Sequence, residues 1–224
     1  MKLYGYFRSS ASYRVRIALN LKGLAYDSVP VHLLKQGGQQ LTADYRAINP
    51  DALVPVLVDT PHNAPHNATH DATLTQSLAI IEYLEETYPT PALLPADPVD
   101  RAFVRSIALQ IACDIHPLNN LRVLRYLVRN LHVADADKDA WSRHWCEQGL
   151  AALETTLARD RRTGAFCFGE SPSMADCLLI PQLANARRVA CDLSAMPTLL
   201  RIEALCQTLP AFIAAAPENQ PDAE

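Results

Sequence analysis

The sequence predicts two domains of different class: an α/β domain over residues 1–88 and an all-helical domain over residues 89–224. In the first part, short apolar segments alternate with segments of helical period, which indicates a small mixed sheet covered by helices. A stretch with four prolines in ten residues follows at 89–98, and no helix is expected there. Beyond it the apolar residues keep helical spacing almost throughout, which is typical of a helical bundle.

The elements of the first domain are expected in the order β-α-β-α-β-β-α. Strands are expected where apolar, β-branched or aromatic residues form short runs, and helices where apolar and polar residues occupy separate faces. The expected strands are Lys2–Phe7, Tyr26–Val31, Leu53–Asp59 and Ala72–Thr75. The expected helices are Ser12–Lys22, a helix that follows the polar stretch Lys35–Gln40 and ends at Ala47, and Ser77–Thr87. In the second domain, the expected helices are Val99–Asn130, Asp137–Asp160, Ser173–Val189 and Met196–Ala215.

The composition argues against several classes of partner. The formal net charge of −4 does not favour binding to nucleic acid or to an anionic membrane. No apolar stretch approaches the roughly 20 residues of a membrane span, and arginines interrupt any signal-peptide pattern near the start. The six cysteines form no Cys-x-x-Cys pair, so we expect reduced thiols in a cytoplasmic protein.

Hydroxyl groups gather where the first strand gives way to the first helix. Ser9, Ser10 and Ser12 lie at this junction, and the start of the helix adds free N–H groups and the positive end of the helix dipole. These features favour an anion, and plain helix capping is the alternative.

Two later segments have similar character. Val54-Pro55 lies in an apolar run, where a cis proline would leave the backbone of Val54 open to a peptide-like ligand, and an edge-strand proline is the alternative. Gln76 and Ser77 precede a helix, with Ser77 suited to be its N-cap and the amides behind it suited to a carboxylate. Together with the serine cluster, these segments predict one site for an anionic peptide.

A four-residue unit containing His62, His66 and His70 repeats between the last two expected strands. Its prolines prevent a regular helix, so the histidines need not share a face. We expect a solvated hairpin loop and no metal site, with adventitious metal binding as the alternative.

In the second domain, Ser173 and Asp176 form the pattern of a capping box ahead of an apolar run. A box of this type is expected to serve folding, not chemistry.

Residues 9–19 read Ser-Ser-Ala-Ser-Tyr-Arg-Val-Arg-Ile-Ala-Leu. This segment resembles a signature close to Ser-Ser-Cys-Ser-x-Arg-Val-Arg-Ile-Ala-Leu of the zeta class of glutathione transferases, which includes maleylacetoacetate and maleylpyruvate isomerases. The resemblance extends over nearly the whole chain, through Leu34–Gln40, Asn49-Pro50, Val54-Pro55, Gln76–Leu84, Leu93–Pro95, Asp114–Asn120 and Asn185–Arg188. Two departures are Ala11, where the family has cysteine, and the histidine-rich insert.

The resemblance implies the glutathione transferase fold, with an α/β thioredoxin-like N-terminal domain and an all-α C-terminal domain, in a homodimer. It implies glutathione as cofactor and, as substrate, a maleyl keto-diacid isomerised from cis to trans in aromatic or tyrosine catabolism. The expected glutathione contacts are Ser9, Ser10, Ala11, Gln40, Val54, Pro55, Gln76, Ser77, His116 and Asn120. Ser9, Ser10 and Arg8 are the expected catalytic residues.

The substrate that the resemblance implies is a small dicarboxylate, and such a substrate would need cationic partners in the site. Arg8, Arg188 and Arg122 are the expected partners, because an arginine can bind a carboxylate through two hydrogen bonds, although each could be an ordinary surface residue. The loss of cysteine at Ala11 is expected to be tolerated. Glutathione brings its own thiol, and Ser9 and the helix dipole would favour its reactive thiolate form.

Two other functions stay open at this point. A general glutathione transferase acting on haloacids or other electrophiles would share Ser9 and the glutathione contacts, and would differ in what the arginines hold. A non-catalytic transferase-like binding protein would have no need of Ser9, Gln76 and Ser77.

Overall fold

The computed structural model describes residues 1–59 and 72–224, which form two compact units. The first unit combines Met1–Ala92 with Pro210–Glu224, and the second comprises Leu93–Leu209. The last part of the chain, expected within the helical domain, therefore belongs to the same unit as the N-terminal α/β part. The histidine repeat, for which we expect a solvated loop, lies outside the described residues.

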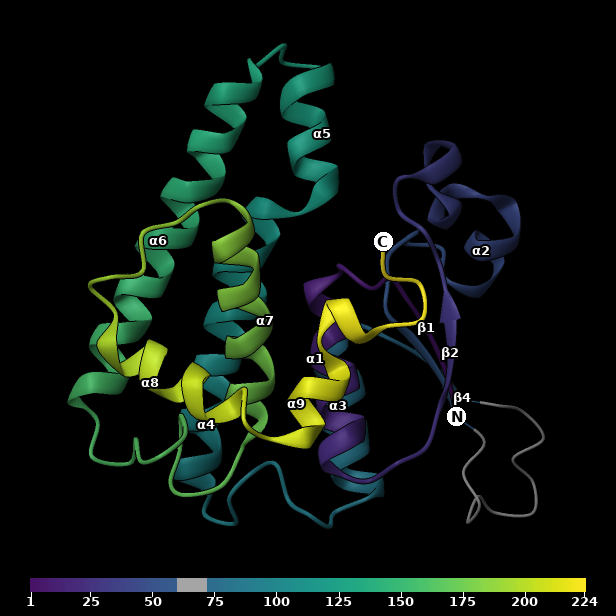
Figure 1. The fold of residues 1–224 in the computed structure, drawn as a ribbon. Helices are drawn as coiled ribbons and strands as arrows, with labels where there is room; N and C mark the ends of the chain where they lie inside the picture. Colours follow the sequence, from purple (N-terminus) through teal and green to yellow (C-terminus); the bar gives the residue numbers. More distant parts are fainter. Residues whose placement is uncertain (60–71) are drawn as a thin grey trace, which may run out of the picture. The chain divides into compact units, whose positions relative to one another are not determined.

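The first unit is built on a four-stranded sheet in the order β2-β1-β3-β4 (Figure 1). Strand β1 pairs in parallel with β2 and antiparallel with β3, which pairs antiparallel with β4. The strands are β1 (Lys2–Gly5), β2 (Asp27–Pro30), β3 (Val56–Asp59) and β4 (Ala72–Thr75). The helices are α1 (Ser10–Leu21), α2 (Ala43–Ile48), α3 (Ser77–Thr87) and α9 (Pro210–Ala215).

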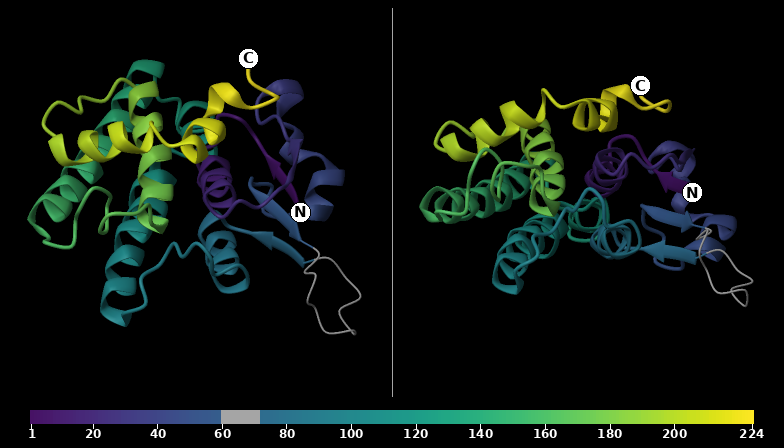
Figure 2. Two further views of the ribbon diagram at one scale, coloured as in Figure 1. Left: turned by 60° about the horizontal axis from the view of Figure 1, so that its bottom comes forward. Right: turned by 90° about the horizontal axis from the view of Figure 1, so that it is seen from below.

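Both faces of this sheet are covered by helices, because its side chains alternate between two apolar layers. Tyr45 of α2 packs with Val31 and Val56 on one face. Helices α1 and α3 pack together on the other face, and α9 lies beside α1 (Figures 1 and 2). A buried ion pair closes the far end of α1, where Lys22 Nζ lies 2.8 Å from Glu85 Oε2 of α3. The same ammonium group donates to the carbonyl groups of Tyr88 and Pro91, so its charge is well satisfied.

The second unit consists of helices around α7, which is buried along most of its length. These helices are α4 (Pro98–Leu109), α5 (Leu121–Arg129), α6 (Asp135–Arg159), α7 (Met174–Arg188) and α8 (Pro197–Cys206). A π-helical turn (Gln110–Ile115) and a 3-10 turn (His116–Asn119) separate α4 from α5.

Prolines account for three differences from the expected helices. The helix expected over Val99–Asn130 is broken near Pro117, and the one expected over Met196–Ala215 ends at Cys206, before Pro210 starts α9. A proline lacks the N–H group that the helix interior requires, whereas the first turn tolerates it. For the same reason Pro98, expected in the linker, is the first residue of α4, with Asp97 as N-cap.

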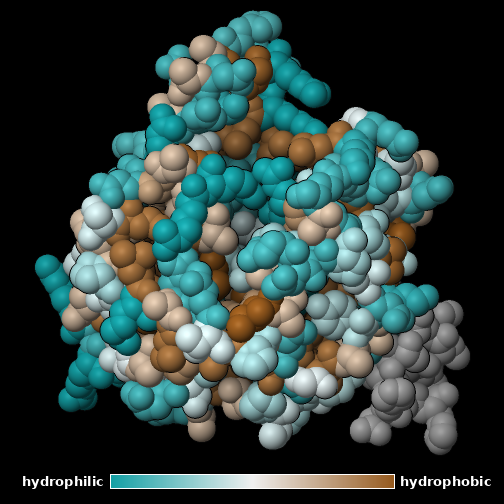
Figure 3. Space-filling model, in the orientation of Figure 1, coloured by the Kyte–Doolittle hydropathy of each residue, from teal (hydrophilic) through white to brown (hydrophobic). Residues whose placement is uncertain are grey.

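The surface in the view of Figure 3 mixes small groups of hydrophobic residues with hydrophilic ones. Among the described residues, no helix is both long enough and apolar enough to span a bilayer. Within the same residues, no three His, Cys, Asp or Glu side chains are grouped so as to hold a metal ion.

Candidate active site

The sheet register brings three predicted segments to one edge of the first unit. Tyr4 of β1 lies opposite Val56 of β3, and Val56 lies opposite Thr75 of β4. Because β3 runs antiparallel to both neighbours, its beginning lies beside the ends of β1 and β4. The serine cluster follows β1, Val54-Pro55 precedes β3, and Gln76 follows β4. The three expected corners of the site therefore meet at this edge.

Helix α1 begins two residues earlier than expected, at Ser10, and Ser9 is its N-cap. The Ser9 Oγ atom accepts a hydrogen bond from the backbone N–H of Ser12 at 3.2 Å. Ser12 itself is fully buried, and its hydroxyl oxygen accepts from the N–H of Tyr6 at 3.4 Å. Ser9 is half-buried and Ser10 is buried, so of the three serines Ser9 is the one that remains partly accessible. No acidic residue lies in the first turn of α1.

At the start of α3, the N-cap is Gln76, not Ser77 as expected. Gln76 has a φ of 66°, a left-handed conformation that is uncommon outside glycine, and its side chain is exposed and makes no capping bond. Backbone strain of this kind is often found at ligand sites. As in α1, the first turn of α3 contains no acidic residue.

A buried arginine connects the two helix N-termini. The guanidinium group of Arg14, on the second turn of α1, donates to Ser77 Oγ at 3.2 Å. Arg14 is 2% exposed, so its positive charge lies inside the unit, close to the beginning of α3. Sequence reasoning assigned no role to Arg14, although it belongs to the signature segment. A buried cation together with two helix N-termini gives this edge a positive potential.

The Val54-Pro55 peptide bond is cis, as the sequence analysis considered, but it precedes β3 instead of lying inside the strand. Pro55 is buried and Val54 is half-buried. On the loop after β2, the side chain of Gln40 is also buried, packed against Gly38. Gly38 has a φ of 114°, and a Cβ atom there would lie 2.7 Å from the Gln40 amide, so only glycine fits.

The other predicted site residues belong to the second unit. His116 begins the 3-10 turn and is half-buried, and Asn120 caps α5 by accepting from the N–H of Arg122 at 3.1 Å. Arg122 is exposed at the start of α5, and Arg188 is exposed at the end of α7. The neighbouring Arg187 pairs with Glu203 of α8, so it helps to hold two helices together.

The geometry by itself defines a class of protein. It has an α/β unit with two helices, α1 and α3, whose first turns contain no acidic residue, and a second unit made of helices. Residues 3–92 match the glutathione S-transferase N-terminal domain, and residues 146–213 match the glutathione S-transferase C-terminal domain. The chain belongs to the glutathione S-transferase family, and the predicted fold class is confirmed.

The nearer relatives narrow the class. A probable maleylacetoacetate isomerase of Vibrio cholerae is 51% identical over 221 residues, 99% of this chain and 97% of that protein. The holo structure of a maleylpyruvate isomerase, described as a bacterial zeta-class glutathione S-transferase, has a TM-score of 0.91 at 45% identity, over 100% of both chains. A maleylacetoacetate isomerase of Methylobacterium extorquens, with bound malonate and glutathione, has a TM-score of 0.91 at 42% identity, again over 100% of both chains. Within its family, the chain is thus a zeta-class member of the maleylacetoacetate and maleylpyruvate isomerase group.

Proposed function

We propose that this protein is a glutathione-dependent isomerase that converts a maleyl keto-diacid, maleylacetoacetate or maleylpyruvate, into the fumaryl isomer. The observation that carries the proposal is the meeting of Ser9, Pro55 and Gln76 at one sheet edge, with two helix N-termini that contain no acidic residue in their first turns. The names of the relatives indicate the same activity.

The donor set at this edge fits glutathione. A tripeptide with two carboxylates and a thiol needs N–H donors, cationic surroundings and some amide partners. The N-termini of α1 and α3 supply the first two, together with Arg14. Among the described residues, the buried Oε1 atom of Gln40 has no hydrogen-bond partner, so it is suited to accept from a peptide N–H.

Each residue at this edge then has a task. When bound, glutathione supplies the thiol that adds reversibly to the conjugated double bond and so permits rotation. The Ser9 hydroxyl donates a hydrogen bond that favours the ionised sulfur, and the dipole of α1 acts in the same direction. Gln76 and the first amides of α3 hold a carboxylate, and the backbone of Val54 binds the peptide portion. Ala11, in the first turn of α1, contributes its backbone and no thiol.

Arg8 follows Phe7 on the loop into α1 and is exposed beside Ser9, so it is suited to bind a substrate carboxylate. Ser10 completes the catalytic loop with its backbone N–H at the start of α1. The glutathione contacts of His116 and Asn120, and the substrate contacts of Arg122 and Arg188, stay predictions from the resemblance.

The first test is a direct assay. Purified protein is mixed with maleylacetoacetate, and separately with maleylpyruvate, with glutathione, without it, and with S-methylglutathione. We expect turnover of at least one substrate with glutathione only, because S-methylglutathione has no free thiol. The substrate that reacts faster also identifies the catabolic pathway, of tyrosine or of another aromatic compound.

The same assay separates the competing functions. If neither diacid reacts but a haloacid is conjugated, the protein is a general glutathione transferase. If calorimetry detects no binding of glutathione, the proposal fails and a non-catalytic transferase-like binding protein is the better description.

We also propose a cytoplasmic homodimer. All six cysteines carry free thiols, which is typical of a reducing compartment, and the family resemblance favours a dimer. Light scattering coupled to size exclusion tests the dimer, for which we expect about twice the chain mass of 24.7 kDa.

A further inference from the structure

The segment Pro210–Glu224, here called the return segment, reaches the loop that carries Arg8 and Ser9. It begins with α9, which packs beside α1 (Figures 1 and 2), continues through a 3-10 turn at Pro217–Asn219, and then follows an irregular path. Gln220 is buried and holds its shape, because its amide nitrogen donates to the carbonyl groups of Ala214 and Ala216 at 2.9 Å each.

Both backbone polar groups of Phe7 are held through the return segment. The Phe7 N–H donates to Asp222 Oδ2 at 3.1 Å. The Phe7 carbonyl accepts from Arg16 Nη2 at 3.0 Å, and Arg16 Nε donates to the carbonyl of Ala215 at 2.8 Å. Phe7 directly precedes Arg8 and lies two residues before Ser9. The direction in which the chain enters α1 is therefore set by contacts about 200 residues away in sequence.

Arg16 links the Phe7 carbonyl to the return segment, and its burial and charge suit this role. It is 3% exposed, and burial lowers its pKa to about 10, so it stays cationic at neutral pH. The charge of Asp222 acts on Arg16 in the opposite direction and raises its pKa. The contact of Asp222 with this loop is the hydrogen bond that its carboxylate accepts from the N–H of Phe7.

The end of the described chain contacts a second loop of the same unit. The carboxylate of Glu224 pairs with Lys35 Nζ, and Glu224 Oε1 lies 3.4 Å from His32 Nε2. His32 Nδ1 accepts from the N–H groups of Leu34 and Lys35, and these two bonds fix the orientation of the ring. Lys35 and Glu224 are more than a third exposed, and exposed pairs contribute little, so we regard this contact as secondary to that of Asp222.

We propose that Asp222 is a positioning residue for the isomerase reaction: its carboxylate oxygen fixes the Phe7 backbone and thereby places Arg8 and Ser9 relative to the bound cofactor and substrate. This role rests on the proposed function. Small displacements of reacting groups cost much of the rate, because productive geometry must be set before reaction.

Two variants separate the oxygen's position from its charge. Asp222→Asn keeps an acceptor oxygen at the same place and removes the charge, whereas Asp222→Glu keeps the charge and displaces the acceptor by one methylene. Glu218→Ala, at an exposed residue of the same segment, is the matched control. The readouts are kcat, the KM for each substrate, the Kd for glutathione by calorimetry, and the Tm.

We expect Asp222→Glu to lower kcat roughly tenfold, with a smaller change in the Kd for glutathione. We expect Asp222→Asn to stay within about threefold of the wild type and Glu218→Ala to match it. The reverse order of the two aspartate variants would assign the effect to charge, and a lower Tm with unchanged kcat and KM would assign it to folding alone. Either result overturns the positioning role.

The outcome for the wild type separates this inference from the proposed function. A wild type that binds glutathione without isomerising either diacid would refute the function, and the Kd for glutathione in the two variants would then decide whether Asp222 places Ser9. A wild type that neither isomerises nor binds glutathione refutes both.

Discussion

Helices of the two units can be compared by what occupies their N-termini. In the second unit, carboxylates of the protein fill those of α4, α7 and α8, whereas α5 begins with the neutral cap Asn120 and no acidic residue in its first turn. Asp97 accepts from two N–H groups of α4, and Glu154 accepts from the N–H groups of Thr198 and Leu199 at the start of α8. Asp176 accepts from the N–H of Ser173, the N-cap of α7, and also from that of Cys167 on the preceding loop. In the first unit, α1 and α3 begin without an acidic residue in the first turn, and their caps are neutral.

This contrast separates structural caps from candidate binding positions. The N–H groups and the dipole at a helix N-terminus attract an anion in either unit. Where the protein supplies its own carboxylate, the helix is stabilised and no ligand is needed. Where it supplies only Ser9 or Gln76, the same groups are suited to an anionic ligand. Ser9 and Ser173 are both serine N-caps, so a single sequence signal precedes two different roles.

The largest expected effect is on turnover, and it compares these two serines. Ser9→Ala should lower kcat roughly 10–1000-fold, because it removes a donor from a developing charge, while destabilising the fold by only about 0.5–2 kcal/mol. Ser173→Ala should destabilise by a similar amount and leave kcat unchanged. Steady-state kinetics of both variants measures kcat, and urea denaturation measures the free energy of unfolding. Equal loss of turnover in the two variants would refute the contrast.

The next effect is on stability, at the closed N-terminus of α7. Asp176 is fully buried and accepts three hydrogen bonds, from Ser173 N–H, Ser173 Oγ–H and Cys167 N–H. Asp176→Ala leaves these donors unpaired and should reduce the free energy of unfolding by about 3 kcal/mol. Asp192→Ala, at an exposed aspartate near the other end of the same helix, is the control and should change little. Chemical denaturation of the two variants and the wild type measures the free energies of unfolding. A loss for Asp176→Ala no larger than that for Asp192→Ala would contradict the prediction.

The third prediction concerns Arg8, the cation that precedes the N-terminus of α1. Arg8→Ala should raise the KM for the diacid substrate roughly tenfold or more, the scale of one charged hydrogen bond, and change the KM for glutathione less. Arg46→Ala, an exposed arginine on α2, controls for the loss of one positive charge. Equal effects of Arg8→Ala on both constants would exclude a substrate-carboxylate role.

Gln76 offers a way to close the open N-terminus of α3. Gln76→Glu keeps the shape of the side chain and adds a negative charge where a carboxylate of the ligand is proposed to bind. The KM for glutathione should rise about tenfold by like-charge repulsion, with the Tm nearly unchanged. Gln148→Glu, at an exposed position of α6, is the matched control. An unchanged KM would remove the start of α3 from the site.

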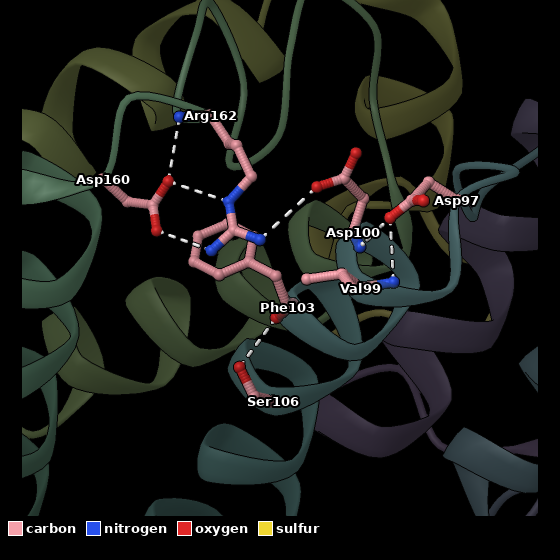
Figure 4. A network of polar contacts seen from close by, with 7 residues as sticks. All are labelled: Asp97, Val99, Asp100, Phe103, Ser106, Asp160 and Arg162. Atoms are coloured by element: carbon pink, nitrogen blue, oxygen red, sulfur yellow. Dashed lines mark hydrogen bonds and ion pairs between the residues drawn. The ribbon is translucent and has the colours of Figure 1, made fainter.

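The smallest effect concerns acid stability near α4 (Figure 4). Arg162 donates to Asp160 through two nitrogens, pairs with Asp100 in the first turn of α4, and lies 3.9 Å from the centre of the Phe103 ring. Its hydrogen bonds lower the pKa of Asp160 to about 2. A carboxyl group whose pKa is lower in the folded than in the unfolded protein stabilises the fold at a pH above the unfolded-state pKa. This contribution is lost as the pH falls through the folded-state pKa.

The wild type should therefore be more stable than Asp160→Asn at pH 6, and the difference should shrink between about pH 4 and pH 2. Thermal melts of both proteins across this range test the prediction. A difference that does not change with pH would show that the charge of Asp160 is not the stabilising feature.

The sequence by itself determined the features that depend on neighbours along the chain. The α/β part followed by helices, the capping box at Ser173 and the meeting of Ser9, Val54-Pro55 and Gln76 in one unit follow from periodicity, capping preferences and the signature segment. The breaks at Pro117 and Pro210 could have been read in the same way, because an interior proline removes a helix hydrogen bond.

Only the tertiary structure decided what depends on distant residues. Nothing local indicates that Arg14 reaches Ser77, that Arg16 reaches Ala215, or that Asp222 holds Phe7, since these partners are separated by 63 to 215 residues. Nor does local sequence show that Gln76 adopts a positive φ and takes the cap position expected of Ser77. Helical and strand periodicity report burial along one segment, whereas the choice of partner across segments is made by packing of the whole unit.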